Sequence, residues 1–219
     1  AMSNEKITVA MITMNEEKAI GKVIGDIQRA VPGAEILVVD SSKDQTPAIA
    51  ERLGARVIRQ FPPKGYGPAM DTALRSGRGE VVVTLDCDDT YPAEKISELA
   101  RLVLEEGYDV VDGSRLERKP AAMEWPNFIA NWAFAALASL LFWRRVTDLH
   151  SGMRAYRKSL FDRLQYHAKG AALPVELLLR PIKEGYRVKI VFIEYRPRIG
   201  VSTMRPWESL VWTVKRILS

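Results

Sequence analysis

Short apolar runs alternate with amphipathic stretches through the first half of the chain, and this alternation constrains the fold more than any other feature. The runs are short enough for buried strands, at residues 7–12, 36–40, 57–58, 81–85 and 110–111. Helices are expected between them, at residues 16–30, 46–53, 67–76 and 92–105. Strands that alternate with helices predict an α/β fold, with a mostly parallel sheet covered by helices on both faces.

Composition bounds the classes of protein that remain. The 219 residues carry no repeat or Gly/Ser linker and predict one α/β domain. The single cysteine, Cys87, excludes a disulfide framework and a thiol metal cluster, and it fits a reducing, cytoplasmic location. The first residues show no secretory signal. The net charge of +5 is concentrated toward the C-terminal part, which suits phosphates or anionic lipid, although a solvated surface has the same composition.

Residues 125–143 contain no charged side chain and are long enough to be considered as a membrane span. Two asparagines and many weakly apolar alanines argue against that interpretation, and a span would also separate two halves of one catalytic unit. We expect an interfacial helix, because Trp125 and Trp143 bracket the segment. A buried helix that covers the sheet is the alternative. Residues 207–218 are expected as a second amphipathic helix that could lie on lipid.

The strongest chemical signal is Asp86-Cys87-Asp88-Asp89, directly after a buried strand. Carboxylates this close repel one another, and a divalent cation removes the repulsion. Mg²⁺ or Mn²⁺ commonly joins one or two protein carboxylates to substrate phosphates. The alternative is an acidic turn at the start of the following helix. We expect Asp86 and Asp88 to be the metal ligands.

Two weaker signals accompany the acidic cluster. Asp40-Ser41-Ser42 follows another buried strand and could bind ribose hydroxyls or a base, or Ser42 or Asp44 could simply cap the next helix. In Lys64-Gly65-Tyr66-Gly67 the glycines allow close approach of backbone to a ligand and Lys64 could meet a phosphate, although many such loops are only turns. In parallel sheets ligands bind beyond the carboxyl ends of the strands, where these residues are expected.

In this order and spacing the three motifs resemble the family 2 glycosyltransferases, which have the GT-A nucleotide-sugar fold. The resemblance implies a nucleotide-binding half over residues 1–115 and an acceptor half over residues 116–219. It also implies a metal-dependent donor site, whose residues would be Thr13, Asn15, Glu16, Asp40, Lys64, Asp86, Cys87, Asp88 and Ser202.

The second half of the chain is similar to the dolichyl-phosphate mannose synthase group and to bacterial polyprenyl-phosphate glycosyltransferases. The similarity lies in residues 112–115, 147–154, 175–179 and 195–202. It implies transfer of a hexose, mannose or glucose, from a GDP- or UDP-sugar to a polyprenyl phosphate with inversion, by a protein peripheral to the cytoplasmic membrane face. Arg115 and Arg198 would meet phosphates. The chain departs from some relatives at residues 126–131, which hold no cation, and at Thr203, where relatives often carry lysine.

Two acceptor chemistries remain open. A phosphate acceptor is already ionised and needs no base. Arginines, for which Arg115 and Arg198 are the candidates, would align it, while the metal held by Asp88 and its neighbour would act with Lys64 to stabilise the departing diphosphate. A sugar hydroxyl would need a carboxylate base, for which Glu176 is the candidate, although Glu176 could equally pair with an arginine such as Arg154.

Several other expectations complete the sequence-based interpretation. His150 could approach the diphosphate, and His167 is expected at the surface. No nucleic-acid partner is expected, and a separate membrane protein is a possible partner. A nucleotidyltransferase would carry a glycine- and arginine-rich signature near its N-terminus, which this chain lacks. A non-catalytic sugar-nucleotide-binding module would not need the metal acids.

Overall fold

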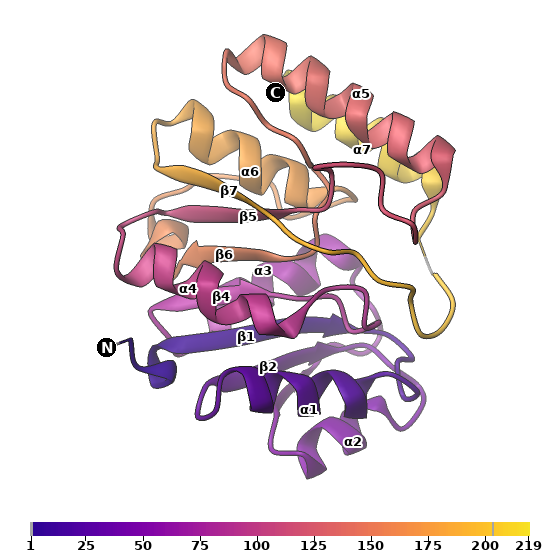
Figure 1. Ribbon diagram of the computed structural model, residues 1–219. Coiled ribbons are helices and arrows are strands. Elements are labelled where there is room, and N and C mark those ends of the chain that lie inside the picture. The colour runs from indigo at the N-terminus through magenta and orange to yellow at the C-terminus, as the bar shows by residue number, and fades with distance from the viewer. Residues whose placement is uncertain (1, 203) are drawn as a thin grey trace.

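The computed structural model describes residues 2–202 and 204–219, so Thr203 lies outside the described residues. A seven-stranded sheet has the order β3-β2-β1-β4-β6-β5-β7, with helices on both faces (Figure 1). The strands are β1 Ile7–Thr13, β2 Glu35–Asp40, β3 Arg56–Arg59, β4 Val81–Thr84, β5 Val110–Ser114, β6 Arg154–Arg157 and β7 Val188–Phe192. The helices are α1 Ile20–Ala30, α2 Thr46–Arg52, α3 Tyr66–Ser76, α4 Ile96–Leu104, α5 Trp125–Phe142, α6 Leu173–Lys183 and α7 Pro206–Leu218.

The expected mostly parallel sheet is confirmed, with one strand that runs the other way. Strands β1 to β4 are mutually parallel where they pair, and β5 pairs with β7 in parallel. Strand β6 is antiparallel to both β4 and β5. Its sequence, Arg-Ala-Tyr-Arg, lacks the apolar run that usually indicates a buried strand. Arg154 is nevertheless buried, because it forms an ion pair with Asp112.

Two predicted helix starts were too early. The helix expected from residue 16 begins at Ile20. The backbone N–H of Glu16 donates to Thr46 Oγ1 (2.9 Å) and ties the preceding loop to the next one. The helix expected from residue 92 begins as a 3₁₀ turn over Ala93–Lys95 and becomes α-helical at Ile96.

Each strand of the sheet sends alternate side chains to two separate apolar layers. On one face Val9 and Met11 of β1 pack in a cluster with Ile24 of α1 and Leu99 of α4. On the other face Ala10 belongs to a cluster formed with α3 and α6. The carboxyl ends of β1, β2 and β4 therefore meet at one edge, between two well-packed layers.

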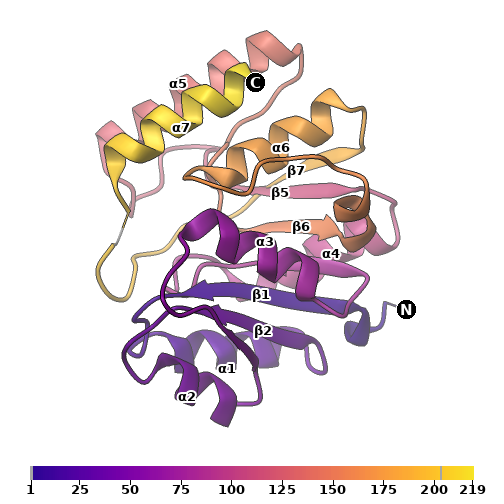
Figure 2. The same ribbon diagram turned by 180° about the vertical axis from the view of Figure 1, so that it is seen from behind.

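Helices α5 and α7 both contact α6, outside the sheet and at the end of the molecule far from α1 and α2 (Figures 1 and 2). Within the described residues, α5 is the one helix with the length and composition to cross a membrane, yet only 11% of it is buried. Ala135 and Ala138 form its buried face. The alternative of a buried helix over the sheet was therefore wrong. Residues 206–218 form the second predicted helix, α7.

Candidate active site

The loops after β1 and β2 are fastened together around Asp40, which is fully buried. Thr13 Oγ1 and Ser42 Oγ both donate to Asp40 Oδ1 (2.6 Å each), and Arg59 forms an ion pair with Asp40 Oδ2. The Asp40 carboxylate is thus engaged within the protein and fixes the shape of both loops. Its predicted contact with a base or ribose stays a prediction.

The first loop places Glu16 near Asp86 and Asp88. Asn15 has a φ of 57°, and its N–H donates to Ser42 Oγ while its side-chain oxygen accepts from Lys43 N (2.9 Å). These bonds hold Asn15 and Glu16 beside the second loop. Before α2, Asp44 Oδ1 accepts from Thr46 N (2.9 Å), the first residue of the helix, whereas the N-cap residue is Gln45 and makes no side-chain cap.

Asp86 lies half-buried at the end of β4, directly against the backbone of Gly152. A Cβ atom at Gly152 would lie 2.6 Å from Asp86 Oδ2, so only glycine leaves room for the carboxylate. Removal from water, followed by the negative charge of Asp88, raises the pKa of Asp86 to about 7. Arg115 and Arg198 lie near enough to lower the pKa of Asp86 in part, but within the described residues neither forms a hydrogen bond or ion pair with the Asp86 carboxylate.

Glu16 faces the same region. Partial burial and then the charge of Asp88 raise the pKa of Glu16 to about 7, against the lowering effect of Arg198. A Cβ atom at Gly200 would lie 3.8 Å from Glu16 Oε2, which puts the segment after β7 over this carboxylate. Glu16 after β1 and the pair Asp86 and Asp88 after β4 therefore lie close to one another.

Asp88 is buried and differs from Asp86 in having partners on both oxygens. Asp88 Oδ1 accepts from Thr90 N (3.2 Å) and from the Thr90 hydroxyl, and Asp88 Oδ2 forms an ion pair with Arg198. Backbone bonds fasten the same segment, since Ile199 N donates to Asp88 O and Arg196 N donates to Thr90 O (2.8 Å each).

The acid pair fits a hard divalent ion. Carboxylate oxygens are the ligands that Mg²⁺ and Mn²⁺ take, and these ions usually complete their shell with substrate phosphates and water. Among the described residues no group of three His, Cys, Asp or Glu side chains forms a closed metal site. Asp86 and Asp88 could therefore hold a metal whose remaining ligands come from water and from a substrate. Cys87 points into the apolar core, and burial raises the pKa of its thiol.

Arg115, predicted to meet a phosphate, is buried and bound to Asp148. Its Nε and Nη2 donate to the two oxygens of Asp148 at 2.7 and 2.9 Å, and its guanidinium stacks over the Tyr195 ring. Although burial alone would raise it, the Arg115 guanidinium lowers the pKa of Asp148 to about 2. Two donors of the Arg115 guanidinium are thus bound within the protein rather than to a ligand.

Glu176 is buried at the start of α6 and holds α7 in place. It forms ion pairs with Arg216 of α7 and with Arg180 (3.6 Å), and its Oε1 accepts from His167 N (3.2 Å). The suggested pairing of Glu176 with Arg154 was wrong, because Arg154 is bound to Asp112 at 2.5 Å, with neither side chain exposed. A structural role for Glu176 fits these contacts.

The remaining predicted residues are spread over the surface and the helical end. Lys64 and Ser202 are exposed, as is His167. His150 lies between α5 and α7, with its Nε2 2.7 Å from Thr213 Oγ1. Tyr91 was missed. Its hydroxyl accepts from Gly152 N (2.7 Å) and so sets the loop under Asp86.

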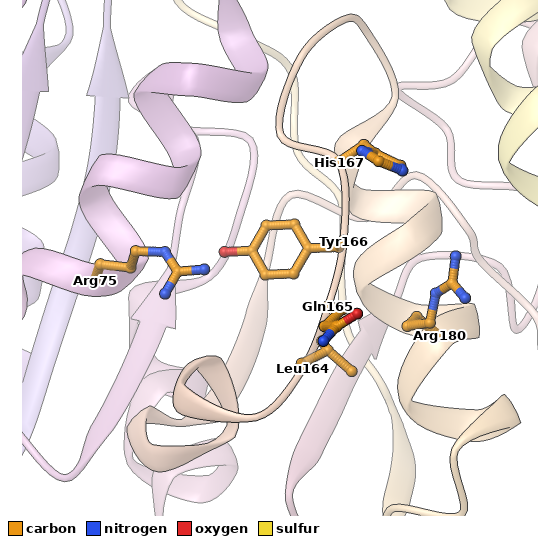
Figure 3. A pocket seen from close by; sticks show the side chains of 6 residues that line it. All are labelled: Arg75, Leu164, Gln165, Tyr166, His167 and Arg180. Atoms are coloured by element: carbon orange, nitrogen blue, oxygen red, sulfur yellow. The ribbon is translucent and has the colours of Figure 1, made fainter.

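A cavity of about 470 Å³ lies apart from the strand ends (Figure 3). Its lining residues are Arg75, Leu164, Gln165, Tyr166, His167 and Arg180. Arg75 is paired with Asp71, and Arg180 with Glu176. Because both guanidiniums already have carboxylate partners, this cavity offers less unpaired charge than the region around Asp86 and Asp88.

Comparison with known proteins places this geometry in a family. The family described as "Glycosyl transferase family 2" matches residues 8–165. A dolichyl-phosphate hexose transferase of Haloferax volcanii is 44% identical over 204 residues, which cover 93% of this chain and 88% of that protein. A polyprenol monophosphomannose synthase of Mycolicibacterium smegmatis is 29% identical over 217 residues, covering 91% and 81%.

Solved structures agree on the fold. Glucosyl-3-phosphoglycerate synthase from Mycobacterium tuberculosis, in complex with UDP, superposes with a TM-score of 0.76 at 22% identity, over 97% of this chain and 80% of that one. At this identity the likeness speaks for the fold alone. Together with the family match and the Haloferax relative, it shows that this chain belongs to glycosyl transferase family 2 and is a glycosyltransferase with the GT-A fold.

Proposed function

We propose that the protein transfers a hexose from a GDP- or UDP-sugar to a polyprenyl phosphate, with inversion at the anomeric carbon and with Mg²⁺ or Mn²⁺ as cofactor. The observation that carries the proposal is the acid pair Asp86 and Asp88, placed at the end of β4 and open to a substrate-supplied ligand. The names of the Haloferax and Mycolicibacterium relatives support the polyprenyl-phosphate acceptor and the hexose.

The donor side follows from the acids. A structure of the mycobacterial synthase holds Mn²⁺ together with UDP, which supports the same kind of ion here. Bound between Asp86 and Asp88, a divalent ion would neutralise the charge that develops on the departing nucleoside diphosphate. Thr13, Asn15 and Glu16 would border the nucleotide, and exposed Lys64 would approach the phosphates.

The acceptor side favours a phosphate over a hydroxyl. A phosphate monoester is largely ionised at neutral pH, since its second pKa is about 6, and it needs only to be aligned with the anomeric carbon. Arg198 forms an ion pair with Asp88, and its guanidinium carries the forked donors that match phosphate oxygens. Glu176, the candidate base for a hydroxyl acceptor, is instead bound to Arg216 and Arg180.

The outer helices fit a membrane surface. We call their exposed side the apolar face: Trp125, Ile129, Trp132, Leu137, Leu140, Leu141 and Trp143 of α5 and its C-terminus, with Trp207, Leu210, Val211, Val214 and Leu218 of α7. Large exposed apolar patches mark interaction sites, and tryptophans beside basic residues favour the lipid interface. We infer peripheral attachment to the membrane that carries the acceptor, on its cytoplasmic side.

The attachment is tested by flotation with vesicles that contain anionic lipid. The wild-type protein should float with them, and replacement of Trp132 and Leu140 by serine should reduce binding about tenfold or more, because each buried apolar side chain contributes roughly 1.5–3 kcal/mol. Arg29→Ser, on the opposite side of the molecule, is the control. Wild-type protein that stays unbound to lipid, or that binds only through a separate membrane protein, would contradict direct attachment.

The transfer reaction is tested with a panel of labelled GDP- and UDP-hexoses and three acceptors. These are a short polyprenyl phosphate, the matching polyprenol without phosphate, and soluble 3-phosphoglycerate. We expect transfer only to the polyprenyl phosphate, only with Mg²⁺ or Mn²⁺, and with inverted anomeric configuration by NMR. Transfer to a soluble acceptor but never to the lipid phosphate would overturn the proposal.

A further inference from the structure

Arg198 occupies the position that a metal ion needs on Asp88. Of the two Asp88 oxygens, Oδ1 is taken by the N–H and hydroxyl of Thr90, so Oδ2 is the oxygen left for a further ligand, and Arg198 binds it. Asp86 is influenced by the charges of Arg115 and Arg198, but within the described residues it forms no ion pair with either. Of the two candidate metal ligands, Asp88 is therefore the one with a direct arginine partner.

A divalent ion and Arg198 cannot share Asp88 Oδ2 without strong like-charge repulsion. Two positive groups within a few ångströms of one another disfavour each other's binding, and the effect is largest where water is partly excluded. Asp88 is 4% exposed, so little solvent screens this site. Entry of the metal must release the guanidinium.

The chain is arranged so that Arg198 can leave while its segment stays. The backbone bonds from Ile199 N to Asp88 O and from Arg196 N to Thr90 O do not involve the Arg198 side chain. That side chain is 35% exposed, so rotation about its own bonds moves the guanidinium into solvent. Arg196, two residues earlier, is instead held by Glu94 and Glu194 on the outside of the segment.

We propose that Arg198 is an internal counter-cation that neutralises Asp88 in the free enzyme and is released by the metal and donor. The competition at Asp88 does not depend on which acceptor the enzyme uses.

The competition is tested by Mn²⁺ binding to the full chain without any substrate, followed by electron paramagnetic resonance. Arg198→Gln should bind Mn²⁺ about fivefold more tightly than wild type, which corresponds to loss of one partly exposed ion pair that the metal must break. The control Arg196→Gln should bind Mn²⁺ as wild type does. An Arg198→Gln protein with unchanged or weaker Mn²⁺ affinity would overturn the competition.

A transfer assay separates this inference from the proposed function. Tighter Mn²⁺ binding by Arg198→Gln, with no transfer by the wild-type enzyme to any polyprenyl phosphate, would uphold the competition and reject the proposed acceptor.

Discussion

The buried framework and the end of β4 treat their acids in opposite ways. In the framework the buried acids have matching arginines: Asp148 with Arg115, Asp112 with Arg154, and Glu176 with Arg216. At the end of β4, Asp86 has no such partner among the described residues, and its pKa rises to about 7. The paired charges hold elements of the fold together, and we call them the frame pairs. We propose that the acid without an ion-pair partner marks where a ligand binds.

The largest effect should come from removing the uncompensated charge. Asp86→Asn keeps the shape of the side chain but weakens metal binding, so kcat/KM for sugar transfer should fall by about 10³-fold or more, which corresponds to several kcal/mol of lost charge stabilisation. The unfolding temperature without ligands should stay level or rise, because the raised pKa shows that the buried charge is unfavourable. Asp89→Asn is the control, since Asp89 is bound to Lys22. A fully active Asp86→Asn enzyme would show that the reaction does not depend on the Asp86 carboxylate.

Breaking a frame pair should affect stability instead. Arg154→Met removes the partner of Asp112 and leaves that acid buried and unpaired, so the free energy of unfolding should drop by about 3–5 kcal/mol. Urea denaturation measures it. Arg29→Met, which breaks an exposed pair with Asp26, should cost less than about 1 kcal/mol. Similar losses in both variants would show that the buried pair of Arg154 with Asp112 contributes no more to stability than the exposed pair of Arg29 with Asp26.

The histidine between α5 and α7 should make stability depend on pH. Burial lowers the pKa of His150 to about 4, from 6.5 in an unfolded chain. Between these values the unfolded chain binds a proton that the folded protein does not, so stability falls as pH drops from about 6.5 to 4. The expected contribution is on the order of 2 kcal/mol. His150→Gln should flatten the wild-type curve by that amount, and an unchanged slope would place the titration elsewhere.

The smallest effect on activity should come from Glu176→Gln. This change weakens the pair with Arg216, but the Arg216 guanidinium keeps backbone acceptors at Ala171, His167 and Lys169. The kcat should therefore stay within about threefold of wild type, with a modest loss of stability. A base for a hydroxyl acceptor would give a loss of about 10²–10⁴-fold, and kcat measurements distinguish the two outcomes.

Local patterns predicted most of the framework. Apolar runs located β1 to β5 but not β7, which pairs with β5 in parallel. The acidic run after β4 pointed to the acid pair that we propose as the metal site. Strand periodicity and like-charge repulsion are visible within a few residues. Strand β6 was missed because its burial depends on Asp112, 42 residues away from Arg154.

Long-range pairing was beyond sequence reasoning. The pair of Glu176 with Arg216 spans 40 residues, and that of Asp88 with Arg198 spans 110. Nothing in the local sequence tells which arginine reaches which acid, since arginines are numerous in the C-terminal part and their partners are chosen by the packing of α6, α7 and the segment after β7. The expected phosphate role of Arg115 did not anticipate its bond to Asp148 for the same reason.

The most direct measurement is a crystal structure with Mn²⁺ and GDP or UDP, with the ion located by its anomalous scattering. We predict one Mn²⁺ bound by oxygens of Asp86 and Asp88 and by the diphosphate, with Arg198 moved off Asp88. A nucleotide bound elsewhere, or an acid pair turned away from a metal-free diphosphate with Arg198 still in place, would contradict this.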